Sequence, residues 1–189
     1  MSKSPPRIAL ISGSTRTASM NKSLVNAMAH IFKDAGAKCV KIDLSRYDMP
    51  IYNGDWEATN GVPKAAKNLV KRLKSCDGVF IATPEYNGCL PPLLKNTIDW
   101  TTRIELGQFS GPVYGIGSAT PGGLSGIMVL RQLHFILNRL GATTVPRQLG
   151  VGFAGKAFDI KGKFIEGRTQ NYAKTLADQM LAEISRRQK

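Results

Sequence analysis

Short apolar runs alternate with helix-like segments along the whole chain, and this alternation restricts the fold more than any other feature of the sequence. Residues 8–11 and 79–82 are apolar without interruption, which is typical of strands covered on both faces. Strict alternation predicts an α/β fold, a doubly wound parallel sheet of five strands in the order 2-1-3-4-5. We expect strands at 8–11, 39–43, 79–82, 112–117 and 143–149, and helices after 21 and at 63–74, 90 or 91–103, 124–140 and 172–186.

The connections after the first, third and fourth strands are expected to form the functional site. In doubly wound sheets, ligands bind beyond the carboxyl ends of the strands, where the strand order reverses. The loops 13–21, 84–89 and 118–123 should therefore lie together. Two further connections, an aromatic loop at 46–56 and a glycine-rich excursion at 151–167, are predicted to lie outside the regular elements.

Hydroxyl-bearing and basic side chains fill the first of these loops. The segment 13–21 joins a buried strand to the start of a helix, where the first backbone N–H groups have no partner and the helix dipole favours an anion. Arg16 adds a permanently charged fork suited to phosphate. The loop is thus a predicted phosphate site, although Ser19 or Asn21 serving only as a helix cap is an alternative. The loop has neither a G-x-x-x-x-G-K-[ST] nor a G-x-G-x-x-G pattern.

A second motif makes the interpretation specific. Residues 84–100 read P-E-Y-N-G-x-x-P-x-x-L-K-N-x-I-D-W, and residues 14–21 read S-x-R-x-x-S-x-N. Together they resemble the flavin-binding segments of the NADPH-dependent FMN reductase family, flavodoxin-like enzymes that include quinone, azo-dye and chromate reductases. The resemblance covers nearly the whole chain and is weakest at 151–167.

This resemblance implies FMN as cofactor, NADPH or NADH as co-substrate, and a small-molecule electron acceptor. It implies no general acid or base, because hydride passes through the flavin, and no metal. The implied cofactor-binding residues are Ser14, Thr15, Arg16, Ser19, Met20, Asn21, Pro84, Glu85, Tyr86, Asn87, Gly88, Ser118, Gly122 and Gly123. Three of these assignments have alternatives. Glu85 could instead form a salt bridge, and Tyr86 could be a surface aromatic that packs on its own loop. The glycines of the third loop could form a plain turn.

The charge of the chain bears on the competing functions. The formal net charge is +13, which favours anionic partners. The basic residues are dispersed over several helices and aromatic residues make up only 7% of the chain, which argues against a nucleic-acid-binding protein. A flavodoxin-type electron carrier is the main alternative to a reductase. Flavodoxins are typically acidic and lack the P-E-Y-N-G loop, so this alternative is disfavoured.

Cellular context and assembly are also predicted from the sequence. The 189 residues are expected to form one domain, 1–189, without an apolar run long enough to span a bilayer. Cys39, Cys76 and Cys89 show no disulfide or metal spacing, so a cytoplasmic protein is expected. Cys89 has no histidine near it in sequence, which disfavours a redox role. The apolar stripe of the helix 124–140 is wider than one core face requires, which predicts a homodimer or homotetramer.

Overall fold

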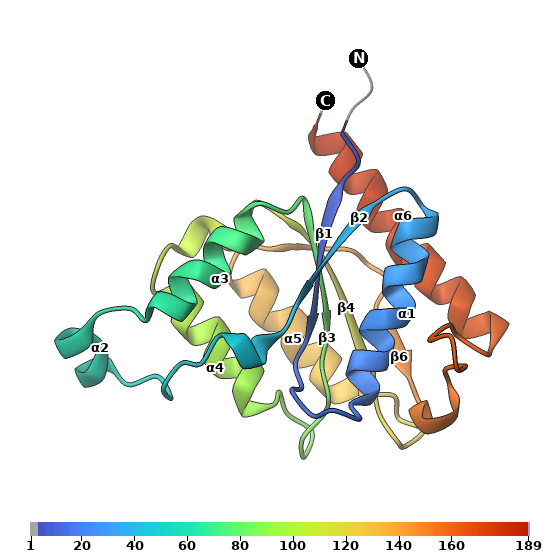
Figure 1. Ribbon diagram of the computed structural model, residues 1–189, viewed down its shortest axis with the longest axis horizontal. Helices are drawn as coiled ribbons and strands as arrows, with labels where there is room; N and C mark the ends of the chain where they lie inside the picture. The colour runs from blue at the N-terminus through green and yellow to red at the C-terminus, as the bar shows by residue number, and fades with distance from the viewer. Residues whose placement is uncertain (1–3, 189) are drawn as a thin grey trace.

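One twisted sheet organises the chain, as Figure 1 shows for the computed structural model, which describes residues 4–188. All its strands run parallel, in the order β2-β1-β3-β4-β5 with β6 also paired to β4. The predicted flavodoxin-like order 2-1-3-4-5 is confirmed. The strands are β1 (Arg7–Ser12), β2 (Lys38–Ile42), β3 (Gly78–Ala82), β4 (Val113–Ala119), β5 (Thr143–Thr144) and β6 (Leu149–Val151).

Helices cover both faces of this sheet. One apolar layer joins α1 and α6 to the sheet, and the second joins α3, α4 and α5 to the opposite face. The central strands β3 and β4 are buried along their whole length, as expected for strands between two helical layers. The helices are α1 (Met20–Asp34), α2 (Gly54–Asn60), α3 (Lys64–Lys74), α4 (Pro92–Thr102), α5 (Ile127–Arg139) and α6 (Gly167–Arg187).

The fifth strand differs from the sequence-based expectation of one continuous strand at 143–149. The structure has two short strands, β5 and β6, which pair with opposite ends of β4. Pro146 lies between them and has no backbone N–H to donate to the sheet. The amide of Arg147 donates instead to Gln179 Oε1 of α6, at 2.9 Å. The strand is therefore interrupted where the chain bonds to a helix.

Helix boundaries also differ from the predictions at three places. α5 begins at Ile127 rather than 124, because Gly126 adopts a left-handed conformation with φ of 73°. α6 begins at Gly167 rather than 172. The connection predicted to be irregular at 46–56 contains the start of α2, whose first amides are capped by the side chain of Asn53.

An ion-pair cluster closes the carboxyl end of α6. Glu183 accepts hydrogen bonds from Arg186 Nε at 2.8 Å and from Arg187 Nε at 2.9 Å. The hydrogen bond from Arg186, followed by that from Arg187, lowers the pKa of Glu183 from its ordinary 4.5 to about 2. Within residues 4–188, no helix is both long and apolar enough to cross a membrane.

Candidate functional site

The three predicted loops lie together at the carboxyl edge of the sheet. The amide of Gly13 donates to the carbonyl of Ala82 at 2.7 Å, and a Cβ added to Gly13 would lie 3.4 Å from Pro84. The amide of Thr83 donates to the carbonyl of Gly117 at 2.9 Å. The parallel strands β1, β3 and β4 thus deliver their following loops to one site.

The first loop presents unused backbone donors. Among the described residues 4–188, the backbone amides of residues 15–19 donate no hydrogen bond. The Arg16 side chain is exposed, and it has no hydrogen-bond or ion-pair partner among the same residues. Ser19 caps α1 by accepting from the amide of Lys22 at 3.4 Å. The capping role is therefore present, and it leaves the preceding amides and Arg16 available for an anion.

Two members of the predicted set are occupied by contacts within the chain. Both ends of the Asn21 side-chain amide bond to Ala119, Nδ2 to its carbonyl and Oδ1 to its amide, each at 3.0 Å. Ser14 is buried and its amide donates to Ser12 Oγ at 3.3 Å. The Met20 side chain lies near Gly155, with its Cε 3.9 Å from a Cβ added to that glycine. Asn21 thereby links the first loop to the third.

The second loop is a tight hairpin. Tyr86 and Cys89 exchange both backbone hydrogen bonds at 3.0 Å, and Asn87 and Gly88 between them have φ of 52° and 77°. An Asn-Gly pair with positive φ at both positions is the preferred two-residue turn of this kind. Nothing lies within 4 Å of a Cβ added to Gly88, so the backbone conformation is what favours glycine here. Tyr86 is 45% exposed at the tip.

Glu85 fixes the second loop to the start of α5. Its Oε2 accepts hydrogen bonds from the amides of Met128 and Val129, both at 3.1 Å. A carboxylate at this position satisfies first-turn amides and interacts favourably with the helix dipole. Gln132 adds a second link, donating to the carbonyl of Gly88 and accepting from the amide of Leu90, both at 3.2 Å. Glu85 forms no ion pair with any residue from 4 to 188.

The third loop places its predicted residues at different depths. Ser118 is fully buried, and a Cβ added to Gly126 would collide with its side chain. The Ser118 hydroxyl has no hydrogen-bond partner among the described residues. Gly122 and Gly123 lie nearer the surface, where the carbonyl of Gly122 accepts from the amide of Phe153 at 3.4 Å.

Phe153 is the residue of this edge that the sequence-based prediction missed. Phe153 is 70% exposed, and its ring lies 3.1 Å from a Cβ added to Gly123. Its φ is 46°, in the left-handed region that a phenylalanine seldom adopts. The signal in the sequence is an aromatic residue between Gly152 and Gly155. Positive φ in a residue other than glycine occurs at three places within 4–188, Asn87, Ser125 and Phe153, and all three lie at this edge.

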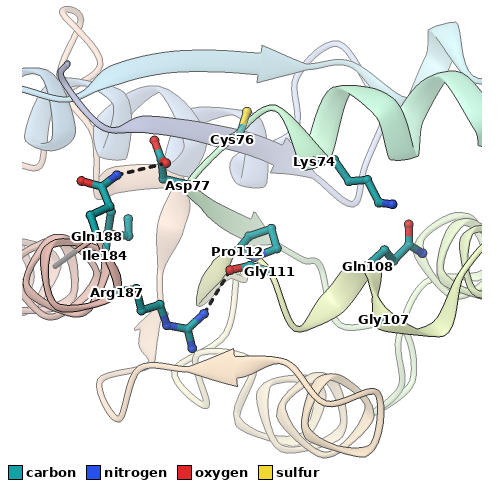
Figure 2. Close-up of a pocket in the computed structure, with 10 residues that line it drawn as sticks. All are labelled: Lys74, Cys76, Asp77, Gly107, Gln108, Gly111, Pro112, Ile184, Arg187 and Gln188. Carbon is teal, nitrogen blue, oxygen red and sulfur yellow. Dashed lines mark hydrogen bonds between the residues drawn. The ribbon is translucent and has the colours of Figure 1, made fainter. Parts of the chain in front are cut away.

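A separate cavity of about 290 Å³ lies at the opposite, amino edge of β3 and β4 (Figure 2). None of the predicted cofactor-binding residues line it. Its charged groups are bonded within the chain: Lys74 pairs with Glu105, Gln188 donates to Asp77, and Arg187 donates to the carbonyl of Gly111 at 3.0 Å. These contacts give the cavity a structural role in joining the end of α6 to the sheet.

Comparison with known proteins identifies the chain. The NADPH-dependent FMN reductase family matches residues 6–156. The chain belongs to this family. FMN is accordingly its cofactor, and NAD(P)H its co-substrate, as the resemblance implied.

Relatives with curated names agree with this assignment. A quinone reductase of Pseudomonas putida is 30% identical over 183 residues, and the match covers 94% of each chain. A quinone reductase of Escherichia coli K12 is 31% identical over 127 residues, and this match covers 66% of this chain and 68% of the relative. In fold, the chain is similar to FerB, an NAD(P)H:acceptor flavoenzyme of Paracoccus denitrificans, with a TM-score of 0.82, 23% identity, and coverage of 96% and 98%.

The residues of the carboxyl edge fit FMN. A phosphate needs convergent N–H donors and positive charge, and the unbonded amides of 15–19 with Arg16 supply both. A flavin ring needs a flat surface and close backbone, which the hairpin at Tyr86 and the glycines 122 and 123 offer. FMN would supply the hydride chemistry, and the chain would bind it, orient it and limit access of water.

Proposed function

We propose that this protein is an FMN-dependent NAD(P)H oxidoreductase that reduces small-molecule acceptors, quinones first. Chromate, azo compounds and free flavin are further candidate acceptors, since the sequence resembles reductases of each kind. The observation that carries the proposal is the row of unbonded amides at 15–19 with Arg16 beside it, at the same edge as the Tyr86 hairpin. The curated quinone reductases that are 31% and 30% identical support the choice of acceptor.

We further propose how the loops divide the work. Residues 14–16 and 19–21 hold the phosphate, with Asn21 acting through its bonds to Ala119. The hairpin 84–88 and the turn 118–123 position the ring. Glu85 holds the hairpin in place through the first turn of α5. Because the chain supplies binding and orientation, we assign no general acid or base.

The experiment that tests the phosphate assignment measures FMN affinity by fluorescence titration of flavin-free protein. Charge-assisted hydrogen bonds are worth roughly 1.5–3 kcal/mol, so Arg16→Ala should weaken FMN binding by about one to two decades. Arg139→Ala is the matched control, an exposed arginine at the far end of α5, and should bind FMN like the parent. Equal affinity in Arg16→Ala and parent would refute the assignment of the phosphate.

Steady-state kinetics separate a reductase from an electron carrier. A reductase should oxidise NAD(P)H with benzoquinone alone, in a ping-pong pattern in which the two substrates use the flavin in turn. A flavodoxin-type carrier would show no turnover without a protein partner. The same assay with chromate and azo acceptors ranks the remaining candidates.

Self-association is part of the proposal. Leu124, Ile127, Met128 and Phe135 expose between 46% and 77% of their surface on or beside α5, and monomers rarely leave large apolar patches uncovered. We propose a homodimer or homotetramer, with this surface as the interface. The mass measured by light scattering at micromolar concentration should exceed the 20.5 kDa of one chain. A monomeric mass at that concentration would contradict the proposed self-association.

We also propose a single flavin-binding domain, 1–189, in the cytoplasm, without nucleic-acid or membrane partners.

A further inference from the structure

A second cavity lies beside the phosphate loop, on the side away from the flavin-ring loops. It measures about 420 Å³ and opens between α1, the end of β2 and α3, a size that falls in the roughly 300–1,000 Å³ range of small-molecule sites. The buried side chains of Leu10, Val25 and Ile42 form its floor. Of the predicted cofactor-binding residues, Ser14 lines it, and no residue of the loops 84–88 and 118–123 does.

Positive charge surrounds this apolar floor. Four basic side chains line the cavity against one carboxylate, that of Asp43, and they come from four different elements. Convergence from separate elements distinguishes the cavity from the solvated basic faces of single helices. The basic residues are Lys22 of α1, Lys41 of β2, Arg46 in the turn after β2, and Arg72 of α3.

The two arginines are available to a ligand, whereas the two lysines are engaged. Lys22 Nζ donates to the carbonyl of Thr15 at 2.8 Å, and Lys41 Nζ donates to Asn26 Oδ1 at 2.6 Å. The guanidinium groups of Arg46 and Arg72 make no hydrogen bond or ion pair with any residue that the structure describes. Planar guanidinium forks bind phosphate in bidentate fashion.

Asp43 and Tyr47 complete the lining. Asp43 follows the last residue of β2 and accepts from the amide of Ser45 at 3.1 Å. An ionised carboxylate offers about four acceptor positions, so it can also accept from a hydroxyl donor. Tyr47 is half-buried and presents the aromatic ring of this cavity. A flat apolar group, hydroxyls and a phosphate would each find a partner here.

We propose that this cavity is a second ligand site, which adjoins the FMN phosphate loop at Ser14 and binds a phosphorylated nucleoside with its phosphate between Arg46 and Arg72. The base would lie on the apolar floor beside Tyr47, and a ribose hydroxyl would donate to Asp43. Such a ligand has two sources, the phosphoadenosine end of NADPH or a free nucleotide. The binding site itself does not depend on the proposed reductase activity.

Calorimetric titration of FMN-saturated protein with adenosine 2′,5′-bisphosphate tests the site directly, because saturation blocks the phosphate loop. We expect saturable binding, and Arg46→Ala and Arg72→Ala should each weaken it about tenfold or more, from the loss of a charge-assisted bond. Lys71→Ala is the matched control, because it removes an equal charge from the next position of α3 without lining the cavity. No binding at millimolar ligand, or equal weakening by Lys71→Ala, would overturn the proposal.

Kinetics then identify the source of the ligand. If Arg72→Ala raises the KM for NADPH and leaves that for NADH unchanged, the site belongs to the dinucleotide. If it weakens binding of the bisphosphate and of 5′-AMP without changing either KM, the site serves a free nucleotide. Both results support a nucleotide site. Loss of FMN binding in Arg16→Ala would be a separate result, since Arg16 does not line this cavity.

Discussion

Replacing Asn21 with alanine should destabilise the protein before any ligand is considered. Asn21 and Ala119 are 2% and 3% exposed, and the two hydrogen bonds between them are each 3.0 Å long. Alanine would leave both the amide and the carbonyl of Ala119 buried without a partner. An unsatisfied buried group costs about 1–3 kcal/mol, so the free energy of unfolding should fall by about 2–6 kcal/mol. This is a large part of the 5–15 kcal/mol typical of a domain.

Urea unfolding of flavin-free protein, followed by tryptophan fluorescence, measures this loss without a contribution from FMN binding. Ser23→Ala is the matched control on the same helix, because its hydroxyl makes no hydrogen bond with a described residue, and it should stay within about 0.5 kcal/mol of the parent. A loss below 0.5 kcal/mol in Asn21→Ala would refute the reasoning, since two buried backbone groups would then be unpaired at no cost.

FMN affinity of the same variant tests the role of Asn21 as a link. The side chain holds the first loop against the end of β4, so its loss should weaken FMN binding as well as folding. Reduced stability with unchanged FMN affinity would show that the link serves folding alone.

Three further predictions concern other elements. Glu183→Gln should destabilise the protein at neutral pH, because the lowered pKa of Glu183 contributes stability only while the carboxylate is ionised. The difference in free energy of unfolding between variant and parent should vanish as the pH falls from 4.5 to about 2, which urea unfolding at several pH values measures. Gly126→Ala should lower the melting temperature, since alanine at φ of 73° is strained and its Cβ would collide with Ser118. Phe153→Gly should keep the free energy of unfolding within about 1 kcal/mol of the parent, because relief of the left-handed strain offsets the entropy of glycine, while kcat/KM for a quinone should fall.

The sequence predicts most of the sheet because its signals there are local and uniform. Unbroken apolar runs at 8–11 and 79–82 identify β1 and β3, and the alternation with helices leads to the strand order. The split of the fifth strand is not predictable in the same way. Pro146 marks a position that cannot donate a backbone hydrogen bond within the sheet. The hydrogen bond that forms next to it, from the amide of Arg147 to Gln179 of α6, joins residues 32 apart in sequence. Long-range contacts of this kind follow from packing.

The candidate site shows the same division. The S-x-R-x-x-S-x-N and P-E-Y-N-G motifs predict which loops form it, and the Asn-Gly turn is legible from two residues. The contacts that hold the loops together are less visible. A salt bridge is the alternative role that the sequence predicts for Glu85, yet Glu85 bonds to backbone amides of α5. No side-chain pattern identifies such a partner. Ser118 lies beneath Gly126 because the turn before α5 folds over it.

Backbone strain at the carboxyl edge follows from these links. A left-handed conformation in a residue other than glycine costs about 1–3 kcal/mol and persists only where the surroundings enforce it. Here Asn87 is held by the Tyr86–Cys89 pair, and Phe153 by its bond to the carbonyl of Gly122. The hairpin is further tied to α5 through Glu85. Because these constraints come from the chain itself, we expect the hairpin 84–88 to be ordered before a cofactor binds. Less conformational entropy would then be lost on binding, and more of the interaction with the ring would remain as affinity.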